Sequence, residues 1–133
     1  MTQGKVTVLG MNGHVGHHAA TAFAARGWEV TGLARGNRRP IPGVRFVEGD
    51  ASEVEDMRRA IGDSEVVVNA LNLSYAEWDR GRMEALHERV VAAMGTGRTM
   101  LFPGNIYNYA ASDRVVTPSL AQNPQTPRGA IRV

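Results

Sequence analysis

The sequence contains no cysteine and only one lysine among its 133 residues. Without cysteine, disulfide bonds, thiolate catalysis and cysteine-based metal centres are excluded. The single lysine is Lys5, and the other fourteen basic residues are arginine. Any chemistry that requires a lysine side chain must therefore use Lys5.

Long apolar runs and a strong charge of one sign are also absent. No apolar stretch approaches the roughly 20 residues that a membrane span needs. The N-terminus lacks the charged and apolar segments of a secretory signal. The net charge is +2, which is too small to indicate a nucleic-acid surface. We therefore expect a cytoplasmic protein with no membrane and no nucleic-acid partner.

Length and composition are typical of one globular domain. Hydrophobic residues make up 43% of the chain and charged residues 21%, as in ordinary soluble proteins. We expect residues 1–133 to form a single domain.

Short β-branched apolar segments alternate with helical patterns along the chain. Such alternation predicts a parallel sheet with helices on both faces, and right-handed crossovers favour the strand order 3-2-1-4-5. The predicted fold class is α/β, a Rossmann-type doubly wound parallel sheet of about five strands. Ser52 and Glu55 have the spacing of a capping box for the second helix. The expected strands are 5–9, 28–34, 44–48, 65–69 and 98–102, and the expected helices are 13–25, 52–61 and 75–94.

The pattern weakens after Phe102, where glycine, asparagine and proline mark a loop of about 25 residues. Residues 128–133 then look like the opening of another helix. We therefore expect a truncated Rossmann fold whose substrate-binding C-terminal part is absent. An open edge at the fifth strand would invite pairing with another chain, which allows a homo-oligomer.

Three glycines at a spacing of three follow the first strand and open the first helix. Gly10 permits a tight turn, Gly13 lets a phosphate approach backbone N–H groups, and Gly16 lets the helix pack close to the sheet. The helix N-terminus supplies N–H donors and the positive end of a dipole. The segment from Gly10 to Gly16 is therefore predicted to bind the pyrophosphate of NAD or NADP.

Other side chains of this segment have expected roles as well. Asn12 can stabilise the turn through its side chain, and His14 and Val15 complete the predicted phosphate contact. His14 and His18 share a helix face, but no acidic residue or cysteine at suitable spacing completes a metal site. We expect no metal, and a histidine close to a bound phosphate instead.

The residue after the second strand indicates the type of dinucleotide. NAD sites usually have an acidic residue there, which binds the ribose hydroxyls. This chain has Arg35, followed by Arg38 and Arg39. The planar guanidinium group binds phosphate oxygens in a bidentate way. The sequence therefore favours NADP over NAD, and a solvated basic loop is the alternative.

Two further segments follow predicted strands. Asp50 and Ala51 follow the third strand, where the carboxylate could accept a hydrogen bond from the adenine amino group. Alternatively, Asp50 only flanks Ser52, the expected helix cap. Ala70, Leu71 and Asn72 follow the fourth strand at the sheet edge where ligands of open α/β sheets lie.

These residues together resemble the extended or atypical short-chain dehydrogenase/reductase group, which includes the NAD-dependent epimerase/dehydratase proteins. The glycine triplet, Arg35, Asp50-Ala51 and Asn69–Asn72 fall where that family has cofactor contacts. The resemblance covers nearly the whole chain but only the N-terminal part of such a protein, because family members are about twice as long. It implies NAD(P)-dependent oxidoreductase or epimerase chemistry.

The catalytic pattern of the family is missing, however. Family enzymes use a serine or threonine after the fifth strand and then a tyrosine with a lysine four residues on. Here Pro103 and Gly104 stand where the hydroxyl residue belongs, and the resemblance places Arg128 at the tyrosine and Arg132 at the lysine. Arginine stays protonated, so it is a poor general acid or base.

One tyrosine remains a candidate for proton transfer. The segment Ile106-Tyr107 resembles the family's Val-Tyr, so Tyr107 is the candidate catalytic residue. No lysine follows it at the fourth position, and Lys5 lies in the first strand. Asn105 is a candidate for a hydrogen bond to a substrate or to the carboxamide of the cofactor.

Three interpretations follow. The first is an NADP-preferring protein of the dehydrogenase/epimerase type that acts, if complete, on a small carbonyl or sugar substrate. The second is a non-catalytic dinucleotide sensor or regulator. The third is a truncated fragment without independent activity.

Overall fold

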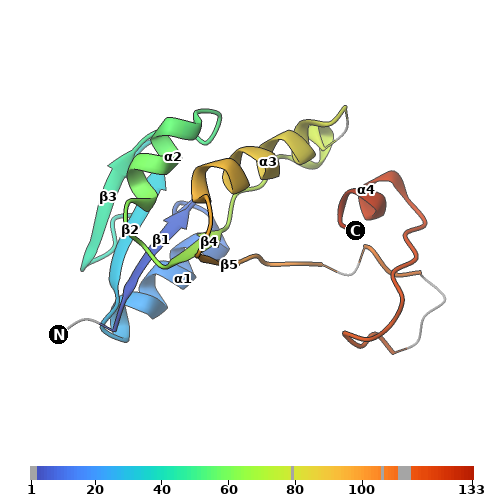
Figure 1. The fold of residues 1–133 in the computed structure, drawn as a ribbon, viewed down its shortest axis with the longest axis horizontal. Coiled ribbons are helices and arrows are strands. Elements are labelled where there is room, and N and C mark those ends of the chain that lie inside the picture. The colour runs from blue at the N-terminus through green and yellow to red at the C-terminus, as the bar shows by residue number, and fades with distance from the viewer. Residues whose placement is uncertain (1–2, 79, 106, 111–114) are drawn as a thin grey trace. The chain divides into compact units, whose positions relative to one another are not determined.

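The computed structural model describes residues 3–78, 80–105, 107–110 and 115–133. Contacts within the chain divide it into two compact units. The first unit comprises Met1–Asn72 and Ala85–Pro103, and the second comprises Leu73–Glu84 and Gly104–Val133. In chain order (Figure 1), the elements are β1 (Lys5–Leu9), α1 (His14–Ala25), β2 (Glu29–Ala34), β3 (Val44–Glu48), α2 (Val54–Ile61), β4 (Val66–Asn69), η1 (Tyr75–Glu77), α3 (Arg82–Met94), β5 (Thr99–Leu101) and α4 (Pro127–Ile131).

The first unit is built on a parallel sheet in the order β3-β2-β1-β4-β5. The predicted Rossmann-type fold and strand order are thus confirmed. In the register, Leu9 of β1 lies opposite Leu33 of β2 and Asn69 of β4. The carboxyl ends of these strands therefore meet at one edge of the sheet.

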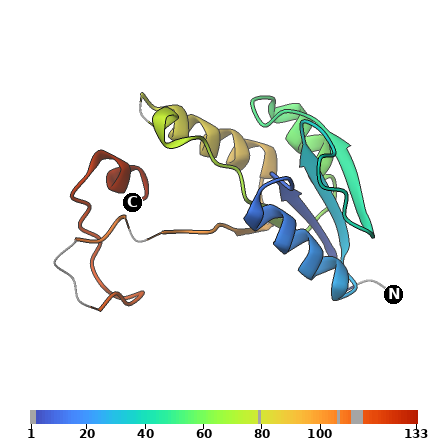
Figure 2. The same cartoon turned by 180° about the vertical axis from the view of Figure 1, so that it is seen from behind.

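Two apolar clusters bury the faces of this sheet. Val6, Val8 and Val30 pack with Ala20 of α1. Residues of the opposite face, among them Leu9, pack with α2 and with the part of α3 that belongs to the first unit. Figures 1 and 2 show α1 on one side of the sheet and α2 on the other. Successive strand residues point to opposite faces, which explains how β1 contributes to both clusters.

The capping box predicted at Ser52 is wrong. Helix α2 begins at Val54 after Glu53, and no side chain caps it. The Ser52 N–H instead donates a hydrogen bond of 2.8 Å to Asp50 Oδ1. This Asx turn uses the local backbone and moves the start of the helix two residues along the chain.

The single long helix predicted for residues 75–94 is also wrong. The short 3₁₀ helix η1 is followed by Arg80 at φ 58° and Gly81 at φ 73°, and α3 begins only at Arg82. A left-handed backbone conformation cannot continue a right-handed helix. Two other predictions agree with the structure. Gly27, at φ 83°, follows the end of α1. Helix α4 forms in the C-terminal segment whose pattern looks like the opening of a helix.

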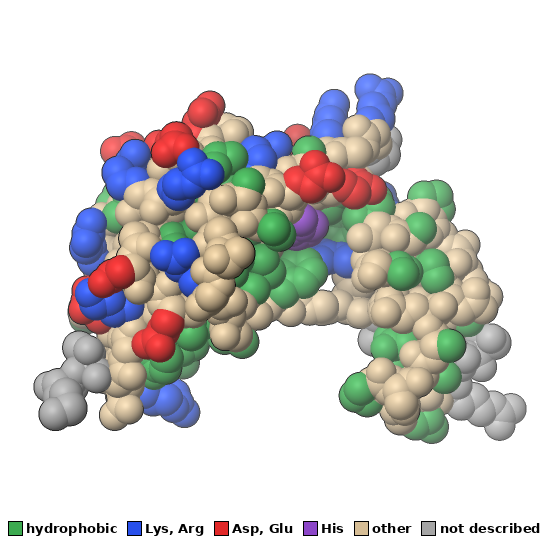
Figure 3. Space-filling view, in the orientation of Figure 1, with side chains coloured by type: hydrophobic (Ala, Val, Ile, Leu, Met, Phe, Trp, Pro, Cys, Tyr) green, Lys and Arg blue, Asp and Glu red, His purple; other side chains and the backbone are tan. Residues whose placement is uncertain are grey.

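Charged side chains of both signs are interspersed over the face of the first unit that carries α2 (Figure 3). Four charged residues of α2 form two ion pairs, Arg58 with Glu55 and Arg59 with Asp56. None of the helices in the described part of the chain has the length and the apolar composition of a membrane span.

Candidate functional site

The glycine turn connects β1 to α1 at the carboxyl edge of the sheet. Gly10 has φ 82°, and its N–H donates to Leu33 O of β2 at 3.1 Å. A Cβ atom at Gly16 would lie 2.1 Å from Gly10 O, which no real side chain tolerates. Gly10 is therefore required by its conformation, and Gly16 by the close approach of the helix to the turn.

The N-terminus of α1 lies at this turn and has no protein cap. Gly13 is the N-cap residue, it makes no side-chain cap hydrogen bond, and the first turn contains no acidic residue. The first N–H groups of a helix have no intrahelical partner and carry the positive end of the helix dipole. His14 and Val15 are exposed, and a Cβ atom at Gly13 would meet nothing nearer than 3.7 Å. The turn therefore fits an anionic group held by backbone donors.

Asn12 connects this turn to the loop that follows β2. Its Nδ2 donates to Gly36 O at 2.7 Å, and the same carbonyl accepts from the Arg38 N–H at 3.0 Å. The sequence predicted that Asn12 would stabilise its own turn, whereas the structure shows it holding the neighbouring basic loop. Gly36 was not predicted as a site residue, because this contact joins two loops far apart in the chain.

Arg35 and Asp50 follow the adjacent strands β2 and β3, and both are exposed. Hydrogen bonds from Ser52 hold the pKa of Asp50 below its usual range, and the positive charge of Arg35 lowers it further. Asp50 is thus an anchored carboxylate beside an arginine. Ala51 is half-buried, and its carbonyl accepts from Arg89 Nε at 3.2 Å.

The end of β4 closes the site on its other side. The Ala70 N–H donates to Leu9 O at 3.1 Å, and a Cβ atom at Gly10 would approach Ala70 O to 3.0 Å. Leu71 N donates to Asn69 Oδ1 at 3.3 Å. Asn72 is exposed where this stretch of the first unit ends. The structure thus brings the predicted residues of four strand ends to one edge of the sheet.

A histidine that sequence reasoning missed lies next to this strand end. His87 Nδ1 of α3 is 3.3 Å from Asn69 Nδ2, and its ring packs edge-on to Phe102 with a centroid separation of 4.9 Å. Because Asn69 Oδ1 accepts from Leu71 N, the amide nitrogen faces His87. The spacing of Met83, His87 and Val90 placed this histidine on the buried stripe of an amphipathic helix, and that signal could have identified it.

His17 of α1 lies close enough to the basic loop to feel the charge of Arg39. Burial lowers the pKa of His17, and the charges of Arg39, His18 and His14 lower it further. No group of three metal-capable side chains occurs within the described residues.

Lys5 lies at the amino end of β1, the end of the strand away from the glycine turn. Its Nζ contacts Asp63 Oδ2 at 2.6 Å, and this hydrogen bond raises the pKa of Lys5. The one lysine of the chain therefore forms an ion pair on the surface, at the amino ends of the strands and away from the glycine turn.

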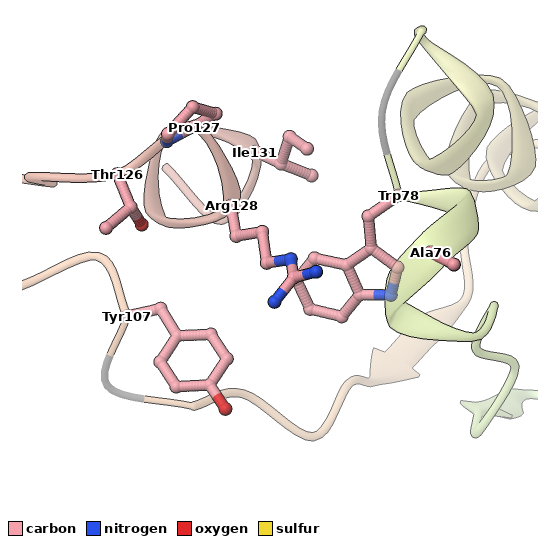
Figure 4. A pocket seen from close by; sticks show the side chains of 7 residues that line it. All are labelled: Ala76, Trp78, Tyr107, Thr126, Pro127, Arg128 and Ile131. Atoms are coloured by element: carbon pink, nitrogen blue, oxygen red, sulfur yellow. The ribbon is translucent and has the colours of Figure 1, made fainter.

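Tyr107 and Asn105 belong to the second unit. The Tyr107 N–H donates to Asn105 Oδ1 at 3.0 Å, and the Tyr107 ring lies 6.4 Å from that of Trp78. Tyr107 also lines a cavity of about 620 Å³ together with Arg128 (Figure 4). Ile106 lies outside the described residues.

With this geometry established, comparison with known families identifies the chain. The sequence model of a family described as NAD(P)H-binding matches residues 10–122. The chain belongs to this NAD(P)H-binding family. The match begins at Gly10, the first residue of the glycine turn, and includes every predicted site residue. No curated protein matches the chain.

Solved structures share the fold of this NAD(P)H-binding chain at low identity. WbmH of Bordetella bronchiseptica, in complex with NAD⁺, is 24% identical with a TM-score of 0.74, and the match covers 97% of this chain and 48% of that one. UDP-glucose 4-epimerase of Thermus thermophilus, in complex with NAD, is 21% identical with a TM-score of 0.76, covering 96% and 47%. UDP-N-acetylglucosamine 4-epimerase of Bacillus cereus is 16% identical with a TM-score of 0.74, covering 98% and 47%.

The two proteins named as 4-epimerases and WbmH have the same Rossmann-type fold as this chain. The chain spans about half the length of the structures that it matches.

Proposed function

We propose that the first unit binds NADP and forms the nucleotide-binding part of a short-chain dehydrogenase/epimerase-type protein that acts on a small carbonyl or sugar substrate. The observation that carries the proposal is the uncapped N-terminus of α1 directly against the glycine turn, with exposed residues around it. Backbone N–H groups in this position are suited to a pyrophosphate. Membership of the NAD(P)H-binding family supports the same conclusion.

The remaining parts of the dinucleotide would contact the neighbouring strand ends. Asp50 and Ala51 lie where the adenine would reach β3, and the anchored Asp50 carboxylate can accept from its amino group. Ala70, Leu71 and Asn72 would line the path of the dinucleotide beyond the pyrophosphate. Asn105 and Tyr107, which belong to the second unit, stay candidates from the sequence alone for contact with the substrate or the cofactor.

The preference for NADP rests on charge at the end of β2. Arg35 is exposed there, and Arg38 and Arg39 follow in the loop that Asn12 holds. A 2′-phosphate would gain charge-assisted hydrogen bonds from this loop. A ribose of NAD would find no carboxylate at the end of β2 to bind its hydroxyls.

The test is a side-by-side titration of NADP and NAD by calorimetry. The parent protein should bind NADP more tightly, and Arg35→Asp should shift the preference toward NAD by about tenfold to a hundredfold, as expected for one charge-assisted contact. Arg26→Asp is the matched control, because Arg26 follows the other end of α1. Failure of both dinucleotides to bind the parent would refute the proposal.

A second function, dinucleotide sensing without catalysis, is favoured by one set of observations. Lys5 is paired with Asp63 at the far edge of the sheet, and arginines occupy the positions that the resemblance assigns to the catalytic tyrosine and lysine. Incubation with NADPH and a panel of carbonyl compounds distinguishes the two functions. Oxidation of NADPH would support a reductase, whereas binding without oxidation would support a sensor.

A further inference from the structure

The turn between β3 and α2 carries Asp50 and is held in place by its neighbours in the first unit. The Gly49 N–H donates to Ala34 O of β2 at 3.0 Å. On the C-terminal side of Asp50, the Ala51 carbonyl accepts from Arg89 Nε of α3 at 3.2 Å. Hydrogen bonds to β2 and α3 therefore fix the backbone directly before and after Asp50.

Asp50 itself is held by a side chain of α2. Its N–H donates to Asp56 Oδ2 at 2.9 Å. The other oxygen of this carboxylate, Asp56 Oδ1, accepts from Arg59 Nη1 at 3.0 Å. Arg59 Nη2 donates to the carbonyl oxygen of Glu48, the last residue of β3, at 2.9 Å. Asp56 and Arg59 thus form a bridge from the end of β3 to the backbone of Asp50.

The Asp56 carboxylate is charged and lies directly against the turn. Hydrogen bonds from the Asp50 N–H and from Arg59 hold the pKa of Asp56 below its usual range. An ionised acceptor makes shorter and stronger hydrogen bonds than a neutral one. A Cβ atom at Gly49 would lie 2.9 Å from Asp56 Cβ, so the turn has little room to shift past this side chain.

A second ion pair of α2 has the same spacing but does not reach the turn. Arg58 contacts Glu55 three residues apart, as Arg59 contacts Asp56. The Glu55 side chain is 79% exposed and that of Asp56 is 27% exposed. Among the described residues, only Arg58 donates to the Glu55 carboxylate. The bridge to the turn is therefore specific to Asp56 and does not follow from helical spacing alone.

We propose that Asp56 is a positioning residue which, together with Arg59, makes the dinucleotide site prefer a purine with an amino group over one with a carbonyl oxygen. This role rests on the proposed function, in which the Asp50 carboxylate accepts from the adenine amino group. A site built to accept a hydrogen bond rejects an analogue that lacks the donor, and an acceptor that is already fixed loses less entropy on binding. Asp56 does not touch the base and acts through the backbone of Asp50.

The experiment compares NADP with nicotinamide hypoxanthine dinucleotide phosphate, in which an oxygen replaces the adenine amino group, by calorimetric titration of the full chain. The parent should bind NADP about tenfold more tightly, as expected for one hydrogen bond to a charged acceptor. Asp56→Ala should reduce this preference to about threefold or less. Asp56→Asn keeps an acceptor for the Asp50 N–H and should restore part of it. Glu55→Ala is the matched control and should keep the parent preference.

Asp50→Ala is the reference for these variants, because it removes the carboxylate that reads the base. It should abolish the preference, and adding Asp56→Ala to it should leave the ratio of the two affinities unchanged. A bridge that serves only the fold would lower both affinities equally in Asp56→Ala. An unchanged ratio in Asp56→Ala would therefore overturn the proposal.

The other end of the bridge gives an independent test. Arg59 is an exposed side chain, and Arg59→Met should lower the preference in the same direction even where Asp56→Ala fails to fold by circular dichroism. Arg58→Met is its control, and equal ratios in these two variants would contradict the bridge. Equal affinity of the parent for the two dinucleotides would overturn this inference alone, whereas binding of neither would refute the proposed function as well.

Discussion

The side-chain amide of Asn12 donates a hydrogen bond of 2.7 Å to the carbonyl oxygen of Gly36. The bond joins the glycine turn after β1 to the basic loop after β2. The same carbonyl accepts from Arg38 N at 3.0 Å, so the loop that carries the arginines has a defined shape. The glycine turn, proposed to bind the pyrophosphate, and the loop proposed to bind the 2′-phosphate are therefore held together by one side chain.

Asn12→Ala should weaken NADP binding several-fold, because the basic loop is no longer held against the turn. The cost in stability should stay below about 1 kcal/mol, the usual contribution of one hydrogen bond. Asn12 Oδ1 is a buried acceptor with no hydrogen-bond partner among the described atoms, so the substitution also removes an unsatisfied group. Calorimetric titration with NADP and urea denaturation measure the two effects.

Asn37→Ala is the control for this change, since Asn37 is exposed in the same loop. It should leave NADP affinity within about twofold of the parent, as for other exposed positions away from specific contacts. An Asn12→Ala variant that binds NADP as tightly as Asn37→Ala would show that the bond to Gly36 does not organise the loop.

Gly16→Ala should destabilise the first unit by about 1–3 kcal/mol, the cost of forcing an extra group into a packed site. Its Cβ atom would lie 2.1 Å from Gly10 O, a backbone atom that can move only if the turn moves. Gly36→Ala is the matched control, because nothing lies within 4 Å of its Cβ position. Urea denaturation of both variants gives the comparison, and equal stability would contradict the close packing inferred at Gly16.

The sheet was predictable because its signals are local. Lys5–Leu9 and Val44–Glu48 are compact β-branched segments, and the structure has strands with these bounds. Parallel crossovers allow few strand orders, so the order 3-2-1-4-5 followed from the alternation of strands and helices. The glycine turn was located for the same reason, since its three glycines directly follow a strand.

The errors arose where a local signal competes with another contact. Ser52 has the pattern of a helix cap, but the Asp50 carboxylate takes its N–H instead. The bond from Asn12 to Gly36 spans 24 residues, and the contact between Asn69 and His87 spans 18. No pattern within one element predicts such pairs, because they depend on how loops and helices meet at the sheet edge.

The stability of the protein should fall as the pH drops below about 6.5, the ordinary pKa of histidine. The folded-state pKa of His17 is lowered by burial and by the charges of Arg39, His18 and His14. Between the folded and unfolded pKa values the unfolded state binds more protons, so acid favours unfolding there. The part of the loss that comes from His17 should level off once the pH is below its folded-state pKa.

His17→Gln should flatten this part of the pH profile, as measured by urea denaturation between pH 5 and pH 8. His18→Gln should retain most of the slope, because burial of His17 is the first cause of its shift. A slope that is the same in His17→Gln and in the parent would assign the acid sensitivity to another group.

Gly129→Ala should disrupt the second unit while leaving the first unit folded. The added Cβ atom would lie 2.2 Å from Tyr107 O and 3.0 Å from Pro124 Cβ, so α4 must move away from the Tyr107 segment. Hydrogen exchange should then be faster in residues 126–133, and protection of the sheet should be unchanged. Gly104→Ala is the control, since nothing lies within 4 Å of its Cβ position. Unchanged protection of α4 in Gly129→Ala would show that the segment tolerates a side chain there, and that the cavity does not depend on this contact.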